Sequence, residues 1–119
     1  MRIGLDYDNT ITVDPRFFSR AARLLGKRNK IYVISSYERK TAMSFAEAYK
    51  YKTAKLRQWK IPYEKLELAP EPIPMNKVRL CDRYGIDIMI DDDRKNVSAI
   101  NRYCKGTVCL QFLPETRLK

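Results

Sequence analysis

Two aspartates stand one residue apart near the start of the chain, directly after an apolar stretch. The sequence reads IGLDYDNTIT from Ile3 to Thr12, with carboxylates at Asp6 and Asp8. Carboxylates this close repel one another unless water or a bound cation offsets their charge. A buried strand that ends in such a pair therefore favours a cation site.

Two further apolar runs also end in polar side chains. KIYVISS finishes in Ser35 and Ser36, and IDIMIDDD finishes in the aspartates Asp91 to Asp93. In open parallel α/β sheets, ligands bind beyond the carboxyl ends of the strands, where the strand order reverses. If the first strand is central, all of these polar groups meet in one crevice.

The metal that such a crevice favours is Mg²⁺. Its side chains offer oxygen ligands, and the sequence contains no histidine. Oxygen donors without nitrogen or sulfur are typical of hard divalent cations. A magnesium ion, a small hydroxyl and a nearby lysine are also the parts that proteins use to hold or move a phosphoryl group. Lys77, at the start of a predicted helix, is the candidate lysine.

Short apolar runs alternate with longer segments of helical period, which is typical of strand-helix-strand units and a parallel sheet. We expect a three-layer, Rossmann-like α/β domain over residues 1–119, with a five-stranded parallel sheet. The expected strands cover residues 2–6, 30–36, 64–69, 86–93 and 106–112. The expected helices cover residues 15–25, 38–59, 75–84 and 95–103, with residues 70–74 as a stiff proline connector.

Two helices have predicted inner faces, and the first also has a basic outer face. The inner residues of the first are Phe17, Phe18, Ala21, Leu24 and Leu25, and those of the second are Ala42, Phe45, Ala46 and Tyr49. The outer face of the first helix carries Arg16, Arg20, Arg23 and Lys27. This ridge could contact nucleic acid, but a solvated helix face is the commoner explanation.

The composition favours a basic, intracellular protein. Lys and Arg number 24 against 14 Asp and Glu, a net charge of +10, which should attract polyanions and phosphorylated ligands. Cys81, Cys104 and Cys109 lack metal-type spacing and are expected to be reduced core thiols. No apolar run reaches the length of a leader or a membrane span, so we expect a soluble cytoplasmic protein without a membrane partner.

Four segments resemble the motifs of the haloacid dehalogenase (HAD) superfamily. LDYDNT resembles the first motif, VISS the second, NK before a helix the lysine motif, and IMIDDD the acidic fourth motif. They occur in the order of that family, and the resemblance spans residues 2–112. It implies a HAD-like fold and a Mg²⁺-dependent phosphatase that acts through an aspartyl-phosphate.

The resemblance also implies roles for individual residues. Asp6 would be the nucleophile, Asp8 the general acid and base, and Lys77 the group that neutralises Asp6 and the phosphate. Ser35 would contact the phosphoryl group, with Ser36 as the alternative. The metal ligands would be Asp6, Asp8 and Asp92, with Asp91 assisting and Asp93 capping a helix. Thr10 would steady the turn and, with Ser36, belong to the substrate site.

No cap domain fits between the predicted motifs. An uncapped site stays open, which in this superfamily goes with large substrates or with closure by a partner subunit. The basic charge and the aromatic residues favour a nucleotide or nucleic-acid phosphate. The chain is loosely similar to the phosphatase half of polynucleotide kinase/phosphatases and to deoxyribonucleotidase-like members. Arg39 and Lys40 are further predicted contacts to the substrate phosphate, although exposed charge alone also explains them.

Two other functions remain open at this stage. A binding or regulatory module could keep the fold and use its basic surface to hold nucleic acid or a protein partner. A phosphotransferase could pass the phosphoryl group to an acceptor other than water, and the sequence does not separate it from a phosphatase.

Overall fold

Five parallel strands form one sheet in the order β3-β2-β1-β4-β5, so the first strand is central. The computed structural model describes residues 1–114, and the last five residues of the predicted domain lie outside them. The strands are β1 (Arg2–Leu5), β2 (Lys30–Ser36), β3 (Lys65–Ala69), β4 (Ile88–Asp91) and β5 (Val108–Gln111). The predicted fold class, a three-layer α/β domain with a five-stranded parallel sheet, is confirmed.

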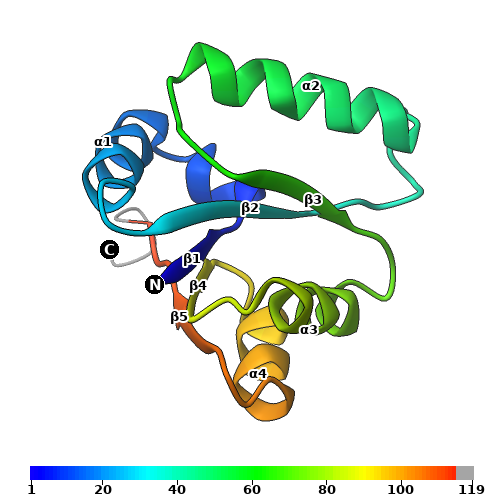
Figure 1. The fold of residues 1–119 in the computed structure, drawn as a ribbon. Helices are drawn as coiled ribbons and strands as arrows, with labels where there is room; N and C mark the ends of the chain where they lie inside the picture. The colour runs from blue at the N-terminus through cyan, green and yellow to red at the C-terminus, as the bar shows by residue number, and fades with distance from the viewer. Residues whose placement is uncertain (115–119) are drawn as a thin grey trace.

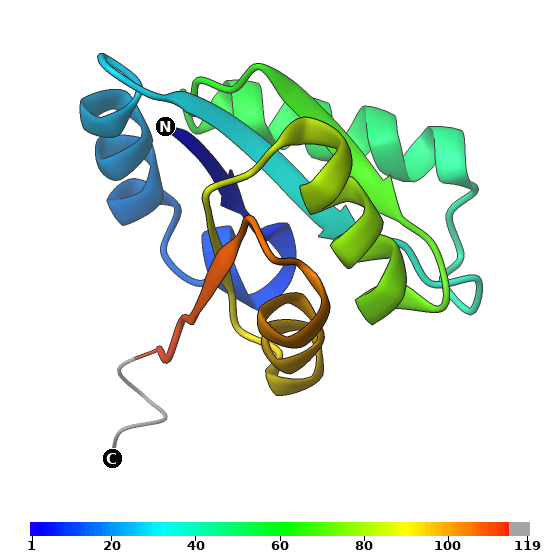
Figure 2. The ribbon, with the colours of Figure 1, turned by 60° about the horizontal axis from the view of Figure 1, so that its bottom comes forward.

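Helices cover both faces of the sheet. They are α1 (Pro15–Leu25), α2 (Phe45–Gln58), α3 (Ile73–Tyr84) and α4 (Arg94–Tyr103). The helices α1 and α2 lie over one face, and α3 and α4 lie over the other (Figures 1 and 2). None of the helices in residues 1–114 is long and apolar enough to cross a lipid bilayer.

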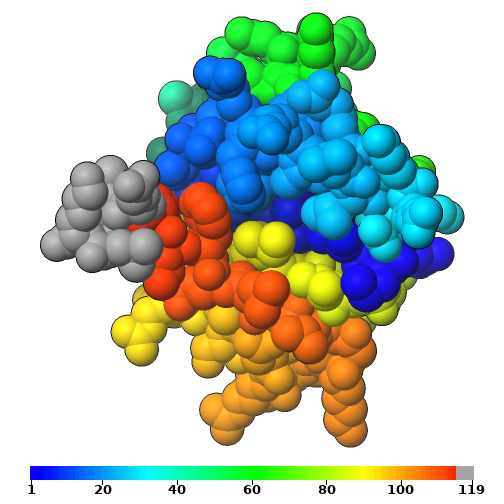
Figure 3. Space-filling view, turned by 90° about the vertical axis from the view of Figure 1, so that its left-hand side faces the viewer, coloured from blue at the N-terminus to red at the C-terminus, as the bar shows by residue number. Residues whose placement is uncertain are grey.

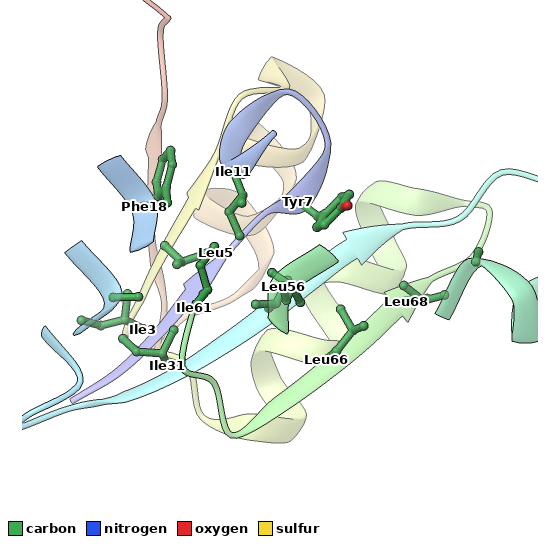
Figure 4. Close-up of a cluster of buried hydrophobic side chains, with 13 residues drawn as sticks. Ile3, Leu5, Tyr7, Ile11, Phe18, Ile31, Leu56, Ile61, Leu66 and Leu68 are labelled. Atoms are coloured by element: carbon green, nitrogen blue, oxygen red, sulfur yellow. The ribbon is translucent and has the colours of Figure 1, made fainter. Parts of the chain in front are cut away.

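The apolar run of β2 shows why the strands are hydrophobic throughout. Side chains alternate between the two faces of a strand. Ile31 and Val33 point into the core under α1 and α2, whereas Tyr32 and Ile34 point into the core over α3 and α4. Figure 4 shows the first of these cores, in which Leu56 of α2 packs against the sheet among the other buried side chains. A strand buried on both faces cannot alternate with polar residues.

The helix α1 begins and ends as predicted, but only part of its predicted inner face is buried. The Asp14 side chain accepts a hydrogen bond from the backbone N–H of Phe17, as an N-terminal cap does. Phe18 and Ala22 are buried, while Phe17, Leu24 and Leu25 are exposed. The reason is tertiary, because the Phe18 ring packs against Phe112 beyond β5, with 5.2 Å between ring centroids. Figure 3 shows this end of the chain, coloured orange to red, against α1 in blue.

The predicted start and inner face of α2 are wrong. The helix begins at Phe45 because Ser44 and Glu47 form a capping box, in which each side chain bonds the backbone N–H of the other residue. Its buried apolar residues are Ala48 and Leu56, whereas Phe45 and Tyr49 are exposed. Residues 38–44, predicted as helix, instead belong to the loop between β2 and α2.

The helix α3 starts two residues earlier than predicted, at Ile73. Pro74 lies in its first turn, where the backbone N–H that proline lacks has no partner within the helix. The helix ends at Tyr84, and Gly85 follows in the left-handed conformation with φ of 60°. The start of α3 matters for the site because it sets where Lys77 lies on the helix.

The attachment of α2 to the sheet can be tested at Leu56, whose side chain is fully buried. We expect Leu56→Ala to lower the free energy of unfolding by about 2–4 kcal/mol, because it leaves a cavity in the core. Leu24→Ala is the matched control, since Leu24 is 63% exposed, and we expect a change within about 0.5 kcal/mol. Urea denaturation followed by circular dichroism measures both. Equal losses would contradict this core arrangement.

Candidate functional site

The carboxyl ends of β1 and β4 lie side by side at one edge of the sheet. Leu5 of β1 pairs with Ile90 of β4, and the backbone N–H of Asp6 donates to the Ile90 carbonyl at 2.9 Å. Asp6 and Asp91 therefore follow paired residues on neighbouring strands. The sequence predicts that the polar strand ends meet if the first strand is central, and β1 is central in this sheet.

A wide turn after β1, η1 (Tyr7–Ile11), brings Thr10 back over the strand end. The backbone N–H of Thr12 bonds the Tyr7 carbonyl at 3.1 Å, and Asn9 adopts a left-handed conformation with φ of 59°. The Thr10 hydroxyl lies 3.1 Å from Asp6 Oδ2 and 3.4 Å from Asp92 Oδ1. Thr10, which the sequence predicted to steady this turn, therefore contacts carboxylates that follow both β1 and β4.

Lys77 reaches the strand ends from α3. Its ammonium Nζ lies 2.7 Å from Asp6 Oδ1 and 2.7 Å from Asp91 Oδ2. The side chain is only 1% exposed, so this is a buried ion pair with two carboxylates. Burial alone lowers the pKa of a lysine, but here the two carboxylates outweigh burial and raise the pKa of Lys77 above its usual range.

Asp6, Asp91 and Asp92 form what we call the acidic cluster. One oxygen of each carboxylate lies within 4.8 Å of the others, and all are buried. This is the combination among residues 1–114 in which at least three potential metal-ligating side chains approach one another. A set of carboxylate oxygens at this spacing fits a hard divalent cation such as Mg²⁺.

The acidic cluster carries more negative charge than Lys77 can balance. Burial is the largest cause that raises the pKa of Asp6; Lys77 lowers it, Asp91 raises it again, and the resulting pKa is about 8. A bound divalent cation would supply the missing positive charge. The buried excess of carboxylate is therefore the electrostatic feature that most favours a cation here.

Asp91 is positioned by two groups besides Lys77. The backbone N–H of Asp93 donates to Asp91 Oδ1 at 3.0 Å, and the Asn96 side-chain amide lies 3.3 Å from Asp91 Oδ2. Asp93 also accepts hydrogen bonds from the backbone N–H groups of Lys95 and Asn96, so its predicted role as a helix cap is confirmed. The sequence analysis missed Asn96, which is buried.

Asp8 does not belong to the acidic cluster. Its Oδ2 lies 3.1 Å from the ammonium of Lys52 and 3.4 Å from the hydroxyls of both Ser35 and Ser36. The reason is geometric, because η1 turns the Asp8 side chain toward β2 and α2 rather than toward β4. Ser35 and Ser36, the two predicted alternatives for the phosphate contact, thus both lie beside Asp8.

A cleft of about 560 Å³ opens over these groups. Its lining includes the side chains of both Asp6 and Asp8, as well as Lys52, Lys77 and Asp92. A second hollow of about 540 Å³ adjoins it and shares Ser36, Glu38, Asp93 and Asn96 with it.

Arg39 and Lys40 line the second hollow rather than the cleft itself. The backbone N–H of Arg39 donates to Glu71 at 3.0 Å, and the exposed ammonium of Lys40 pairs with Glu38 at 3.4 Å. These two predicted phosphate contacts thus lie beside the cleft, on the loop between β2 and α2.

Lys52 is the cleft residue that the sequence analysis missed most clearly. It follows Ala48 by four residues and precedes Leu56 by four, and both of those residues are buried. Residues four apart lie on one face of a helix, so Lys52 sits on the buried face of α2. A lysine placed between two apolar residues at four-residue spacing was the signal in the sequence that could have identified it. It was missed because the predicted inner face of α2 was wrong.

The chain is similar in structure to universal stress proteins. One from Archaeoglobus fulgidus in complex with dAMP has a TM-score of 0.60 and 17% identity, over 93% of this chain and 98% of that one. Another, in complex with cAMP, has a TM-score of 0.57 and 11% identity, over 93% and 96% of the two chains. No protein-family model matches the chain, and no curated protein sequence matches it.

These comparisons correct the family assignment. At such low identity they show a shared fold alone, and these similar structures are universal stress proteins rather than HAD phosphatases. On these comparisons the predicted HAD membership, the phosphatase activity and the aspartyl-phosphate mechanism are wrong. The catalytic roles given to Asp6, Asp8, Ser35 and Lys77 followed from that family, although the structure does bring these side chains to one edge of the sheet.

The raised pKa of Asp6 predicts how the free energy of unfolding depends on pH when no metal is bound. The pKa of Asp6 is about 8 in the folded chain and about 4 in an unfolded one. The folded state therefore binds this proton more tightly, and its contribution to stability is lost as the pH rises toward 8. We expect the free energy of unfolding, measured with urea in EDTA, to fall between about pH 5 and pH 8.

Asp6→Asn tests the cause of that fall. The amide removes one buried charge while Asp91 still pairs with Lys77, so we expect the variant in EDTA at pH 8 to be more stable by about 1–2 kcal/mol and its pH dependence to be flatter. Asp8→Asn is the matched control, because Asp8 is half-exposed and has its own ammonium partner. We expect it to cost at most about 1 kcal/mol. An Asp6→Asn variant less stable than wild type in EDTA would contradict the proposed imbalance.

Proposed function

We propose that this chain is a Mg²⁺-assisted binding module for a nucleotide, held in the cleft at the carboxyl ends of the strands. The observation that carries the proposal is the acidic cluster, with its buried Lys77, at the floor of a cleft beside the central strand. In doubly wound sheets this is the position at which ligands bind.

The residues fit the metal in number and chemistry. Asp6, Asp91 and Asp92 would hold Mg²⁺ through carboxylate oxygens, and the cation would supply positive charge toward a phosphate. Lys77 keeps Asp6 and Asp91 together through its 2.7 Å contacts, and Thr10 links Asp6 to Asp92. The phosphate would lie over these groups, beside Ser36, which lines the cleft.

The rest of the cleft suits an aromatic ring. Tyr37, Met43 and Tyr51 line it on the side of α2 and the preceding loop. Aromatic side chains stack on bases, and methionine packs against rings. Two structures that share the fold are complexes with dAMP and cAMP, and both of these ligands combine a base with a phosphate. A nucleotide therefore suits the cleft better than a sugar phosphate or an inorganic anion.

A calorimetric titration tests the proposal. AMP, adenosine and ribose 5-phosphate are titrated into the protein in excess Mg²⁺ and again in EDTA. We expect AMP to bind most tightly in Mg²⁺ and to lose about tenfold or more of its affinity in EDTA, because the cation offsets repulsion between phosphate and the acidic cluster. A short single-stranded oligonucleotide in the same assay tests the broader basic surface.

Variants identify the site. Asp92→Asn should lose most of the Mg²⁺ dependence of AMP binding. The matched control is Asp87→Asn, because Asp87 is exposed at the opposite edge of the sheet, where its side chain accepts from the backbone N–H of Arg2. No saturable binding of AMP with or without Mg²⁺ would overturn the proposal. Release of inorganic phosphate from the bound nucleotide would also contradict a binding function.

A further inference from the structure

Lys52 is placed in the cleft by more contacts than a surface lysine makes. Its ammonium Nζ lies 2.6 Å from the Ser35 hydroxyl, 3.0 Å from the Ser36 carbonyl and 3.1 Å from Asp8 Oδ2. Its side chain is only 12% exposed. An ammonium has three N–H donors, so these partners match its full capacity.

The Lys52 ammonium also lies against an aromatic ring. Its Nζ is 5.0 Å from the ring centroid of Tyr7, a cation–π distance. Tyr7 follows β1, Ser35 and Ser36 end β2, and Lys52 comes from α2. A single charge thus links the ends of the two strands to the helix above them.

The partner of Lys52 is easily replaced. The Asp8 side chain is 47% exposed, so water can solvate its carboxylate once the ammonium leaves it. A half-exposed ion pair contributes little net stability. A phosphate offers several strong acceptor oxygens and a larger negative charge, so it competes well with one carboxylate for the same ammonium.

The neighbours of Lys52 limit what the rest of the ligand can be. Tyr51 precedes it on α2, and Met43 and Tyr37 line the same cleft. The Tyr37 hydroxyl donates to the Met43 carbonyl at 2.9 Å, which holds this wall in place. A phosphate at Lys52 would therefore carry its base toward an apolar and aromatic wall within the same cleft.

We propose that Lys52 selects nucleoside monophosphates over nucleosides by exchanging Asp8 for the phosphate of the ligand. Asp8 acts as a built-in competitor that occupies the ammonium until a phosphate arrives. This inference rests on the proposed nucleotide function and adds to it the residue that binds the phosphate. The exchange involves only Lys52, Asp8 and the phosphate, and it does not require the side chains of the acidic cluster to move.

The first test compares AMP with adenosine in excess Mg²⁺ by calorimetry. Lys52→Met keeps the aliphatic stem but removes the charge, and we expect about a tenfold or greater loss of AMP affinity with adenosine affinity unchanged. Lys52→Arg should recover part of the loss. Lys50→Met is the matched control, because Lys50 is exposed on the same helix and does not line the cleft; it should bind AMP as wild type does.

Asp8→Asn provides a second test, in which the expected result is a gain of affinity for AMP. Without the competing carboxylate, we expect AMP to bind about twofold to fivefold more tightly, with no change for adenosine. Thermal unfolding of every variant checks that the fold is intact. If Lys52→Met is too unstable to titrate, the gain expected for Asp8→Asn still decides the matter.

The outcomes separate this inference from the function on which it rests. If wild type binds neither AMP nor adenosine, the proposed function fails. If wild type prefers AMP but Lys52→Met keeps that preference, or Asp8→Asn weakens AMP binding, the role of Lys52 is overturned and the nucleotide function stands. Equal losses for AMP and adenosine in Lys52→Met would show that Lys52 only attaches α2 to the sheet, which also overturns the inference.

Discussion

The buried ammonium of Lys77, between the carboxylates of Asp6 and Asp91, is the contact on which this edge of the sheet depends. It joins α3 to the ends of β1 and β4 through two distances of 2.7 Å. Removing this ammonium would cost about 3–5 kcal/mol, since it would leave two buried carboxylates without compensation. One ammonium cannot balance the whole acidic cluster, so a cation bound there would stabilise the fold by supplying the missing positive charge.

The topology divides the cleft into two parts with different electrostatic properties. Toward β4, the acidic cluster is buried and held by α3. Toward β2, Asp8 is half-exposed and is held by Lys52 of α2. Because β1 is the central strand, the turn that follows it supplies a carboxylate to each part. A ligand that spans both would meet a fixed charge on one side and an exchangeable one on the other.

The corrected family assignment has a physical explanation. Polar side chains at the carboxyl ends of parallel strands are a general property of doubly wound sheets, because ligands bind there in many unrelated proteins. The spacing of Asp6, Asp8, Ser35 and Lys77 places them at this edge of the sheet. The same sheet order accommodates different chemistries, so the gathering of these residues does not identify a reaction.

The sequence by itself determined the strands, their parallel arrangement and the polar groups at their ends, because apolar runs, helix caps and Gly85 are local signals. Only the tertiary structure decided which helix faces are buried, since that depends on the neighbours across the sheet. The exposure of Phe17, the burial of Leu56 and the approach of Lys52 to Asp8 follow from such packing. Lys52 and Asp8 are 44 residues apart, and no local pattern encodes a contact at that separation.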